Sequence, residues 1–219
     1  MKNDLYFGGE KTPRAQFERR ARCIASVLKD YEIGPDDAVA VLLRNDTLYL
    51  EVMAACRLVG AYYVTLNWHS AAAEIIDILA DSQAKIVIGH SDLTAKLTGL
   101  SVPVLAVLTP AKLVSAYSVD AAMTEGQENL HALIDAAKPL ESKPQRFRGM
   151  LAYTSGSTGR PKGIRRIADP NGPDRYETYR ALAKGLMGLA PGDRFYTAAP
   201  LYHSAPNALS LMTLSLIHI

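Results

Sequence analysis

The sequence contains few of the residues that mark specialised classes of protein. Its 219 residues include only two cysteines, Cys23 and Cys56, which lie far apart within helical patterns and carry no partner motif. This usage argues against a disulfide framework or a cysteine metal site and predicts two buried, reduced thiols. The net charge is only +2. Such a mild charge without basic clustering argues against a nucleic-acid partner.

Long apolar runs are also missing. No stretch is long enough to span a bilayer, and the polar start, Met1 to Phe7, lacks the apolar core of a signal peptide. We therefore expect a cytoplasmic protein without a transmembrane segment. The histidines show no metal-ligand spacing, so no protein-held metal site is predicted. They are His69, His90, His131, His203 and His218.

The residues that are present alternate between short apolar runs and helical patterns. Apolar residues make up 48% of the chain, enough for a globular core. The run AVAVLL at 38–43 is continuous, which predicts a strand that is buried on both faces. Further strands are predicted at 61–66, 84–89, 103–108, 150–154 and 194–199, and helices at 12–28, 46–59, 70–81, 176–189 and 205–219. This order favours an α/β fold with a mostly parallel sheet flanked by helices.

Local signals mark several of these boundaries. Thr12 as a cap with Pro13 at the first helical position is typical of a helix start, and Asp46 can cap the second helix, which Gly60 ends. The segment 110–147 has weak periodicity and is interpreted as a connector that contains one short helix.

The segment from Tyr153 to Gly163 reads YTSGSTGRPKG and follows a predicted strand directly. Its glycines allow backbone amides to approach a phosphate closely, its hydroxyls can donate, and Lys162 adds a positive charge. The spacing matches neither a Walker loop nor a dinucleotide fingerprint. A flexible Ser/Gly linker is the alternative, but the preceding strand and the RPKG continuation argue against it. Ser157 lacks the partners of a hydrolase nucleophile.

The same loop resembles the signature of the adenylate-forming (AMP-binding) superfamily, which includes acyl-CoA synthetases, luciferases and peptide-synthetase adenylation domains. Three further segments resemble family sequences: GPDDAVAVLLRND, Asn67-Trp68-His69 followed by Glu74, and Ala199 to Pro206. The second of these is similar to fatty acyl-CoA synthetases. The resemblance covers nearly the whole chain and is weakest from 110 to 147.

This resemblance implies an activity and its cosubstrates. Similar enzymes use ATP and Mg2+ to convert a carboxylic acid to an acyl-adenylate, and coenzyme A then takes the acyl group. A fatty or other hydrophobic acid is the implied substrate, and a homodimer is compatible with the sequence. By motif position, the residues that would hold the phosphates of ATP are Thr154, Ser155, Gly156, Ser157, Thr158, Gly159, Lys162 and Gly163. Lys162 would act as a phosphate clamp; the alternative is a solvated surface lysine.

His203 matches an aromatic-His motif that, in similar enzymes, places the histidine beside the carboxylate and adenylate. Tyr202 would shape the acyl entrance or else be a core aromatic. Asn67, Trp68 and His69 suggest only packing or capping. Ile164, Arg165 and Arg166 stand where many family members have a Ser/Thr-His pair.

The sequence stops before several family motifs. It lacks the Tyr-Gly-x-Thr-Glu segment, the ribose-binding aspartate, the hinge and the small C-terminal domain with its catalytic lysine. We therefore interpret 1–219 as the truncated N-terminal part of the large AMP-binding domain, with the phosphate loop at 153–163, and expect it to be inactive alone. There are two alternative hypotheses: an adenylating enzyme that loads a carrier protein, and a non-catalytic ATP-binding fragment.

Overall fold

A central parallel sheet organises the protein. The structure, a computed structural model, describes residues 4–154, 162–165, 167, 169, 171–190 and 193–216. Six strands form the sheet in the order β7-β6-β5-β3-β4-β8, and every neighbouring pair is parallel. Their bounds are β3 Ala38–Leu42, β4 Tyr62–Thr65, β5 Ala84–His90, β6 Val104–Val107, β7 Glu128–Asn129 and β8 Met150–Leu151. The predicted α/β class with a mostly parallel sheet is confirmed.

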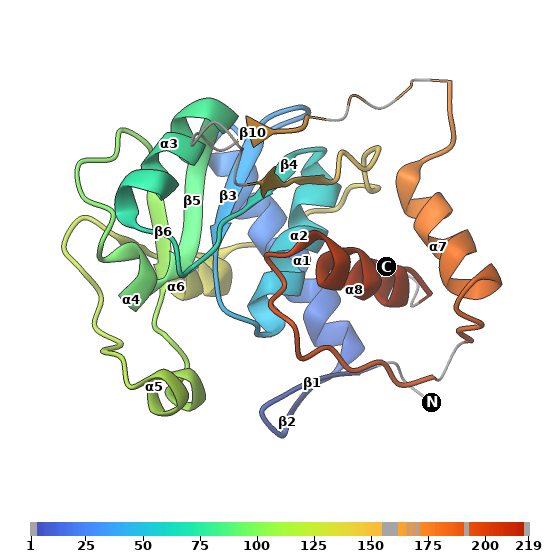
Figure 1. Ribbon diagram of the computed structural model, residues 1–219, viewed down its shortest axis with the longest axis horizontal. Coiled ribbons are helices and arrows are strands. Elements are labelled where there is room, and N and C mark those ends of the chain that lie inside the picture. Colours follow the sequence, from blue (N-terminus) through green and yellow to red (C-terminus); the bar gives the residue numbers. More distant parts are fainter. Residues whose placement is uncertain are drawn as a thin grey trace.

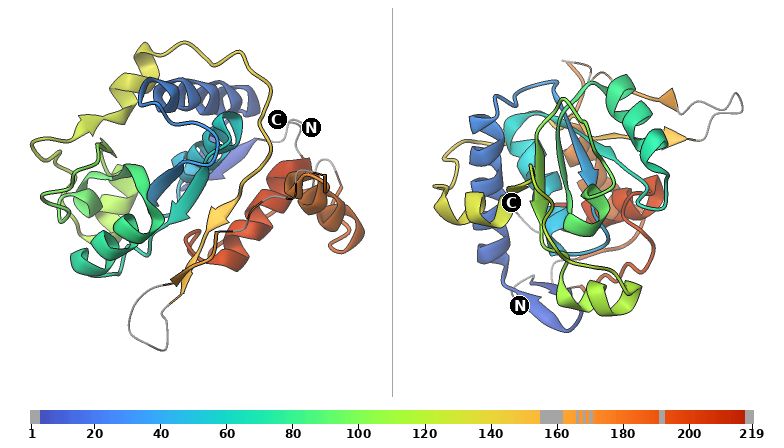
Figure 2. Two further views of the ribbon diagram at one scale, coloured as in Figure 1. Left: turned by 90° about the horizontal axis from the view of Figure 1, so that it is seen from above. Right: turned by 90° about the vertical axis from the view of Figure 1, so that its left-hand side faces the viewer.

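Helices cover both faces of this sheet (Figures 1 and 2). One apolar cluster joins it to α1 (Arg14–Asp30), α2 (Thr47–Val59) and α6 (Leu130–Ala136). A second cluster joins its other face to α3 (Ala72–Ser82) and α4 (Ser91–Thr94). The remaining elements are α5 Ala111–Tyr117, α7 Arg175–Gly185, α8 Ser204–Leu216 and two antiparallel pairs, β1 Leu5–Phe7 with β2 Glu10–Thr12 and β9 Tyr153–Thr154 with β10 Lys162–Gly163. No described helix is long and apolar enough to cross a membrane.

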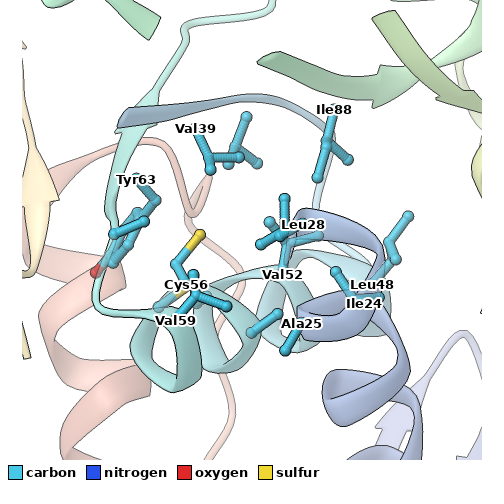
Figure 3. Packing of buried hydrophobic residues seen from close by; sticks show 14 of the residues in the cluster. Ile24, Ala25, Leu28, Val39, Leu48, Val52, Cys56, Val59, Tyr63 and Ile88 are labelled. Atoms are coloured by element: carbon cyan, nitrogen blue, oxygen red, sulfur yellow. The ribbon is translucent and has the colours of Figure 1, made fainter. Parts of the chain in front are cut away.

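The central strand β3 explains why its sequence is apolar throughout. Val39 and Val41 point into the cluster with α1 and α2, whereas Ala40 and Leu42 point into the cluster with α3. All four are fully buried, because alternate residues of a strand face opposite sides of a sheet that is covered on both. Figure 3 shows Val39 among residues of α1 and α2, including Cys56. Cys23 and Cys56 are free and buried, as predicted.

Two of the predicted helix boundaries are confirmed. The Asp46 carboxylate accepts a hydrogen bond from the backbone N–H of Tyr49 at 2.9 Å and so caps α2. Gly60 ends α2 with a left-handed backbone, φ 80°. The predicted Thr12 cap is wrong, because the N-cap of α1 is Pro13 and no side chain caps it.

Substituting Gly60 with alanine is expected to lower the free energy of unfolding by about 1–2 kcal/mol, the cost of a left-handed backbone for a residue with Cβ. The added Cβ would also lie 3.1 Å from Cβ of Gln145. Gly185→Ala is the matched control, because that glycine ends α7 without a positive φ and has open space around its Cβ position. Urea unfolding of both variants checks this; equal midpoints would contradict it.

Three predictions need correction: one of a connector, one of a strand and one of a helix end. Residues 110–147 contain two helices, α5 and α6, and the strand β7, rather than one short helix. The two-residue strand β7 pairs through its backbone while both side chains are exposed, so it leaves no periodic pattern. The predicted strand 150–154 splits: β8 joins the main sheet, and β9 pairs with β10. The helix predicted to reach residue 189 ends at Gly185.

The strand predicted at 194–199 is wrong. These residues are described but form no strand, and Tyr196 is 85% exposed. Aromatic residues favour strands only where a neighbouring strand takes up the backbone hydrogen bonds, and no described strand lies against this segment.

Candidate functional site

The predicted phosphate loop begins and ends on a short hairpin. Tyr153 and Thr154 form β9, and Lys162 and Gly163 form β10. In their antiparallel register Thr154 faces Lys162 and Tyr153 faces Gly163. The two ends of the loop are therefore neighbours at the edge of the main sheet, just after β8. Ser155, Gly156, Ser157, Thr158 and Gly159 lie outside the described residues.

The base of this hairpin is fixed by Tyr153. Its hydroxyl donates a hydrogen bond to Asp81 Oδ2 at 2.6 Å, at the end of α3. Burial, followed by the bond to Asp81, raises the pKa of the Tyr153 phenol above its usual range. Gly163 packs so closely that a Cβ there would lie 2.5 Å from the Tyr153 ring. The absence of a side chain at Gly163 thus lets β10 lie against that ring.

The segment from Ala199 to His203 is hydrogen-bonded to Asn45, which follows the carboxyl end of β3. Asn45 donates to the carbonyl of Ala199 at 2.9 Å and accepts from the N–H of Leu201 at 2.8 Å. The chain then turns and enters α8 at Ser204. His203 is exposed, and its ring centroid lies 4.3 Å from that of half-buried Tyr202.

Three aromatic residues gather beside this turn. Trp68 lies edge-on to both Tyr202 and Tyr117, at centroid distances of 6.4 and 5.3 Å. Arg44 lies over the faces of Trp68 and Tyr117, at 5.2 and 4.6 Å. Asn67 accepts a bond from the N–H of His69 at 2.9 Å within a turn, but it caps no helix, because the N-cap of α3 is Ala71 without a side-chain bond. Trp68 packs against the second apolar cluster, in line with the packing alternative. The contact between Trp68 and Tyr202 was not predicted.

A buried ionic network supports the aromatic residues. Arg44 donates two hydrogen bonds to Asp92, at 2.9 and 2.8 Å, and the two side chains are 5% and 9% exposed. His90 Nε2 lies 3.0 Å from Asp46 Oδ2. Burial would raise the pKa of Asp92, but bonds from Arg44 and Thr109 together with the Arg44 charge outweigh it and lower that pKa.

The sequence predicted Asp46 only as a helix cap, and the roles of Arg44, Asn45 and Asp92 were missed, although a signal was present. Arg44, Asn45 and Asp46 follow β3, and Asp92 follows β5. Polar residues directly after buried parallel strands meet at the carboxyl edge of the sheet, where α/β proteins bind ligands. Of the predicted site residues, His203 lies at this edge. No group of three His, Cys, Asp or Glu placed to hold a metal occurs in the described ranges.

Comparisons with known proteins agree with this architecture. Feruloyl-CoA synthase of Amycolatopsis sp is 33% identical over 200 residues, which are 90% of this chain and 36% of that protein. The medium/long-chain-fatty-acid–CoA ligase FadD6 of Mycobacterium tuberculosis is 29% identical over 98% of this chain and 34% of its own length. The solved structure of the anthranilate CoA ligase AuaEII, in complex with anthranoyl-AMP, matches 97% of this chain and 40% of that one with a TM-score of 0.76 and 20% identity.

The structural match shows a shared fold. The chain spans about a third of the length of the two relatives. A sequence profile described as AMP-binding enzyme matches residues 3–217, nearly the whole chain. The chain therefore belongs to the AMP-binding enzyme family.

Proposed function

We propose that the full-length protein activates a carboxylic acid with ATP, releasing pyrophosphate, and transfers the acyl group from the adenylate to coenzyme A. The observation that carries this proposal is the pairing of β9 with β10, the two strands that flank residues 155–161. In this pairing Thr154 lies opposite Lys162, next to the edge strand β8 of the parallel sheet. The two ends of a glycine- and hydroxyl-rich segment are therefore held side by side. Residues 1–219 are, in this proposal, the N-terminal part of the AMP-binding domain.

The phosphate contacts are assigned to the residues predicted from the motif. Backbone amides and hydroxyls would bind the β- and γ-phosphates, and Lys162 would supply the charge that stabilises the transferring phosphoryl group. Bound Mg2+ would share that charge. The contributing residues are Thr154, Ser155, Gly156, Ser157, Thr158, Gly159, Lys162 and Gly163.

We assign the acid to the surface beside His203 and Tyr202. His203 is exposed next to the aromatic edges of Tyr202 and Trp68, which suit a hydrophobic or aromatic acid. The relatives are named for ferulate, medium- and long-chain fatty acids and anthranilate. Their variety supports a hydrophobic carboxylic acid, fatty or aromatic, as the substrate class.

Pyrophosphate exchange tests the function. Full-length protein with ATP and Mg2+ should exchange pyrophosphate into ATP in the presence of one or more of ferulate, anthranilate and medium- or long-chain fatty acids, and should then form the CoA thioester. Omitting the acid is the control. The 219-residue chain alone is expected to give no exchange. A full-length protein that is inactive with every acid would contradict the proposal. If the thioester formed only on a carrier protein, the carrier protein and not coenzyme A would be the acyl acceptor.

A further inference from the structure

Both polar groups of the Leu201 backbone are held by side-chain amides, one from the distant Asn45 and one from Asn207 in the helix that follows. Asn45 Oδ1 accepts from the Leu201 N–H at 2.8 Å. Asn207 Nδ2 donates to the Leu201 carbonyl at 2.9 Å. Asn45 also donates to the carbonyl of Ala199 at 2.9 Å. We call Asn45 and Asn207 together the amide clamp.

Each member of the amide clamp is itself fixed. Asn45 lies between two residues of the ionic network: the Arg44 N–H donates to His90 Nδ1 at 3.2 Å, and Asp46 caps α2. Asn207 is 1% exposed and accepts a bond from the Tyr63 hydroxyl on β4 at 2.8 Å. A buried amide with satisfied partners is held in one orientation, because any rotation leaves polar atoms unpaired.

By holding Leu201, the amide clamp sets the position of the next two residues, Tyr202 and His203. The Leu201 side chain is 3% exposed within the core, and the His203 N–H donates to the Pro200 carbonyl at 3.1 Å, closing a turn. The His203 side chain is exposed and its ring lies 4.3 Å, centroid to centroid, from the ring of Tyr202. A shift of the backbone at Leu201 would therefore move both rings together.

We propose that Asn45 and Asn207 are positioning residues that place Tyr202 and His203 against the acid substrate by fixing the backbone of Leu201. This inference rests on the proposed function for its kinetic consequence, while the clamp itself is testable without activity. Neither asparagine is expected to touch ATP, so the clamp should affect use of the acid and leave use of ATP nearly unchanged.

Kinetics of the full-length protein test the proposal. Asn45→Ala is expected to lower kcat/KM for the acid by about 10- to 100-fold, the scale of a small misplacement in an active site. KM for ATP should stay within about twofold. In a background that carries both Tyr202→Ala and His203→Ala, the same change should cost less than about threefold, because the two residues through which it acts are already gone. A full additional loss in that background, or an equal loss in ATP use, would overturn the proposal.

Hydrogen exchange gives a readout that is independent of activity. Asn45→Ala should speed exchange of the Leu201 amide by about tenfold, since one hydrogen bond is lost, while amides of β3 keep their protection. Asn129→Ala is the matched control, because Asn129 also holds a backbone N–H, that of Ala132, but at the start of α6. It should change neither Leu201 exchange nor acid use. Unchanged exchange at Leu201 in Asn45→Ala would show that there is no clamp.

The two proposals can fail separately. Wild-type protein without acid-dependent pyrophosphate exchange would refute the function, and hydrogen exchange would still decide whether the clamp exists. Active wild-type protein with an additive Asn45 effect would refute only the positioning role. Asn207 is buried, so Asn207→Ala can prevent folding; half-buried Asn45 is therefore the primary variant.

Discussion

Lys162→Ala in the full-length protein should lower kcat/KM for ATP by about 10- to 150-fold. This range corresponds to about 1.5–3 kcal/mol for one charge-assisted hydrogen bond to a phosphate. KM for the acid should change little, because Lys162 is assigned to the phosphates and His203 to the acid. Steady-state kinetics with ATP and the acid varied separately measure both values.

The control for this prediction is a lysine without a predicted role. Lys184 lies exposed in the last turn of α7, so Lys184→Ala should leave the ATP kinetics unchanged. Lys162→Arg should retain part of the activity, since the charge stays but its geometry changes. Wild-type ATP kinetics in Lys162→Ala would mean that 153–163 is not the phosphate loop.

Asp92→Ala should cause the largest loss of stability, about 3–5 kcal/mol in the free energy of unfolding at neutral pH. The substitution leaves the Arg44 guanidinium buried at 5% exposure without its paired carboxylate. Replacing both residues, Arg44→Met with Asp92→Leu, should recover much of this loss, because no unpaired charge remains. Urea unfolding of the two variants and the wild type provides the measurement.

The loss of stability caused by Asp92→Ala should become smaller at low pH. The folded pKa of Asp92 lies below its ordinary value, so its ionised form stabilises the fold above the unfolded pKa of about 3.9. This contribution falls as the pH drops through the lower folded pKa, and the gap between wild type and Asp92→Ala should narrow there. The exposed pair Lys85–Asp37 is the control, and Lys85→Ala should cost less than about 1 kcal/mol. A comparable loss there would contradict the role of burial.

Local signals allowed part of this fold to be predicted. The apolar run of β3 predicted burial on both faces, because a strand without polar alternation has no side to turn toward water. Asp46 and Gly60 marked the ends of α2, since capping and left-handed backbones depend on single residues. The phosphate loop could be proposed at 153–163 because the residues that suggest it form one continuous segment.

The remaining features depend on residues that are far apart. Asn45 binds the backbone N–H of Leu201, 156 residues further along the chain, and no local pattern around Asn45 indicates this bond. The aromatic residue Tyr196 favours a strand, yet strand formation depends on a partner strand that its own sequence does not encode. The two residues of β7 form a strand only because β6 offers its edge.

The strand order also bears on how the protein is made. Strands β3 to β7 emerge from the ribosome before β8, yet β8 pairs with β4, at the other side of the sheet from β7. The edge of β4, with its apolar side chains Tyr63 and Val64, therefore stays unpaired while residues 66–149 are synthesised. An open apolar edge is where nascent chains associate wrongly. Pairing of Met150 and Leu151 with Tyr63 and Val64 covers the edge of β4, and the chain passes from there directly into β9, so this edge is protected only after residues 150–151 have been synthesised.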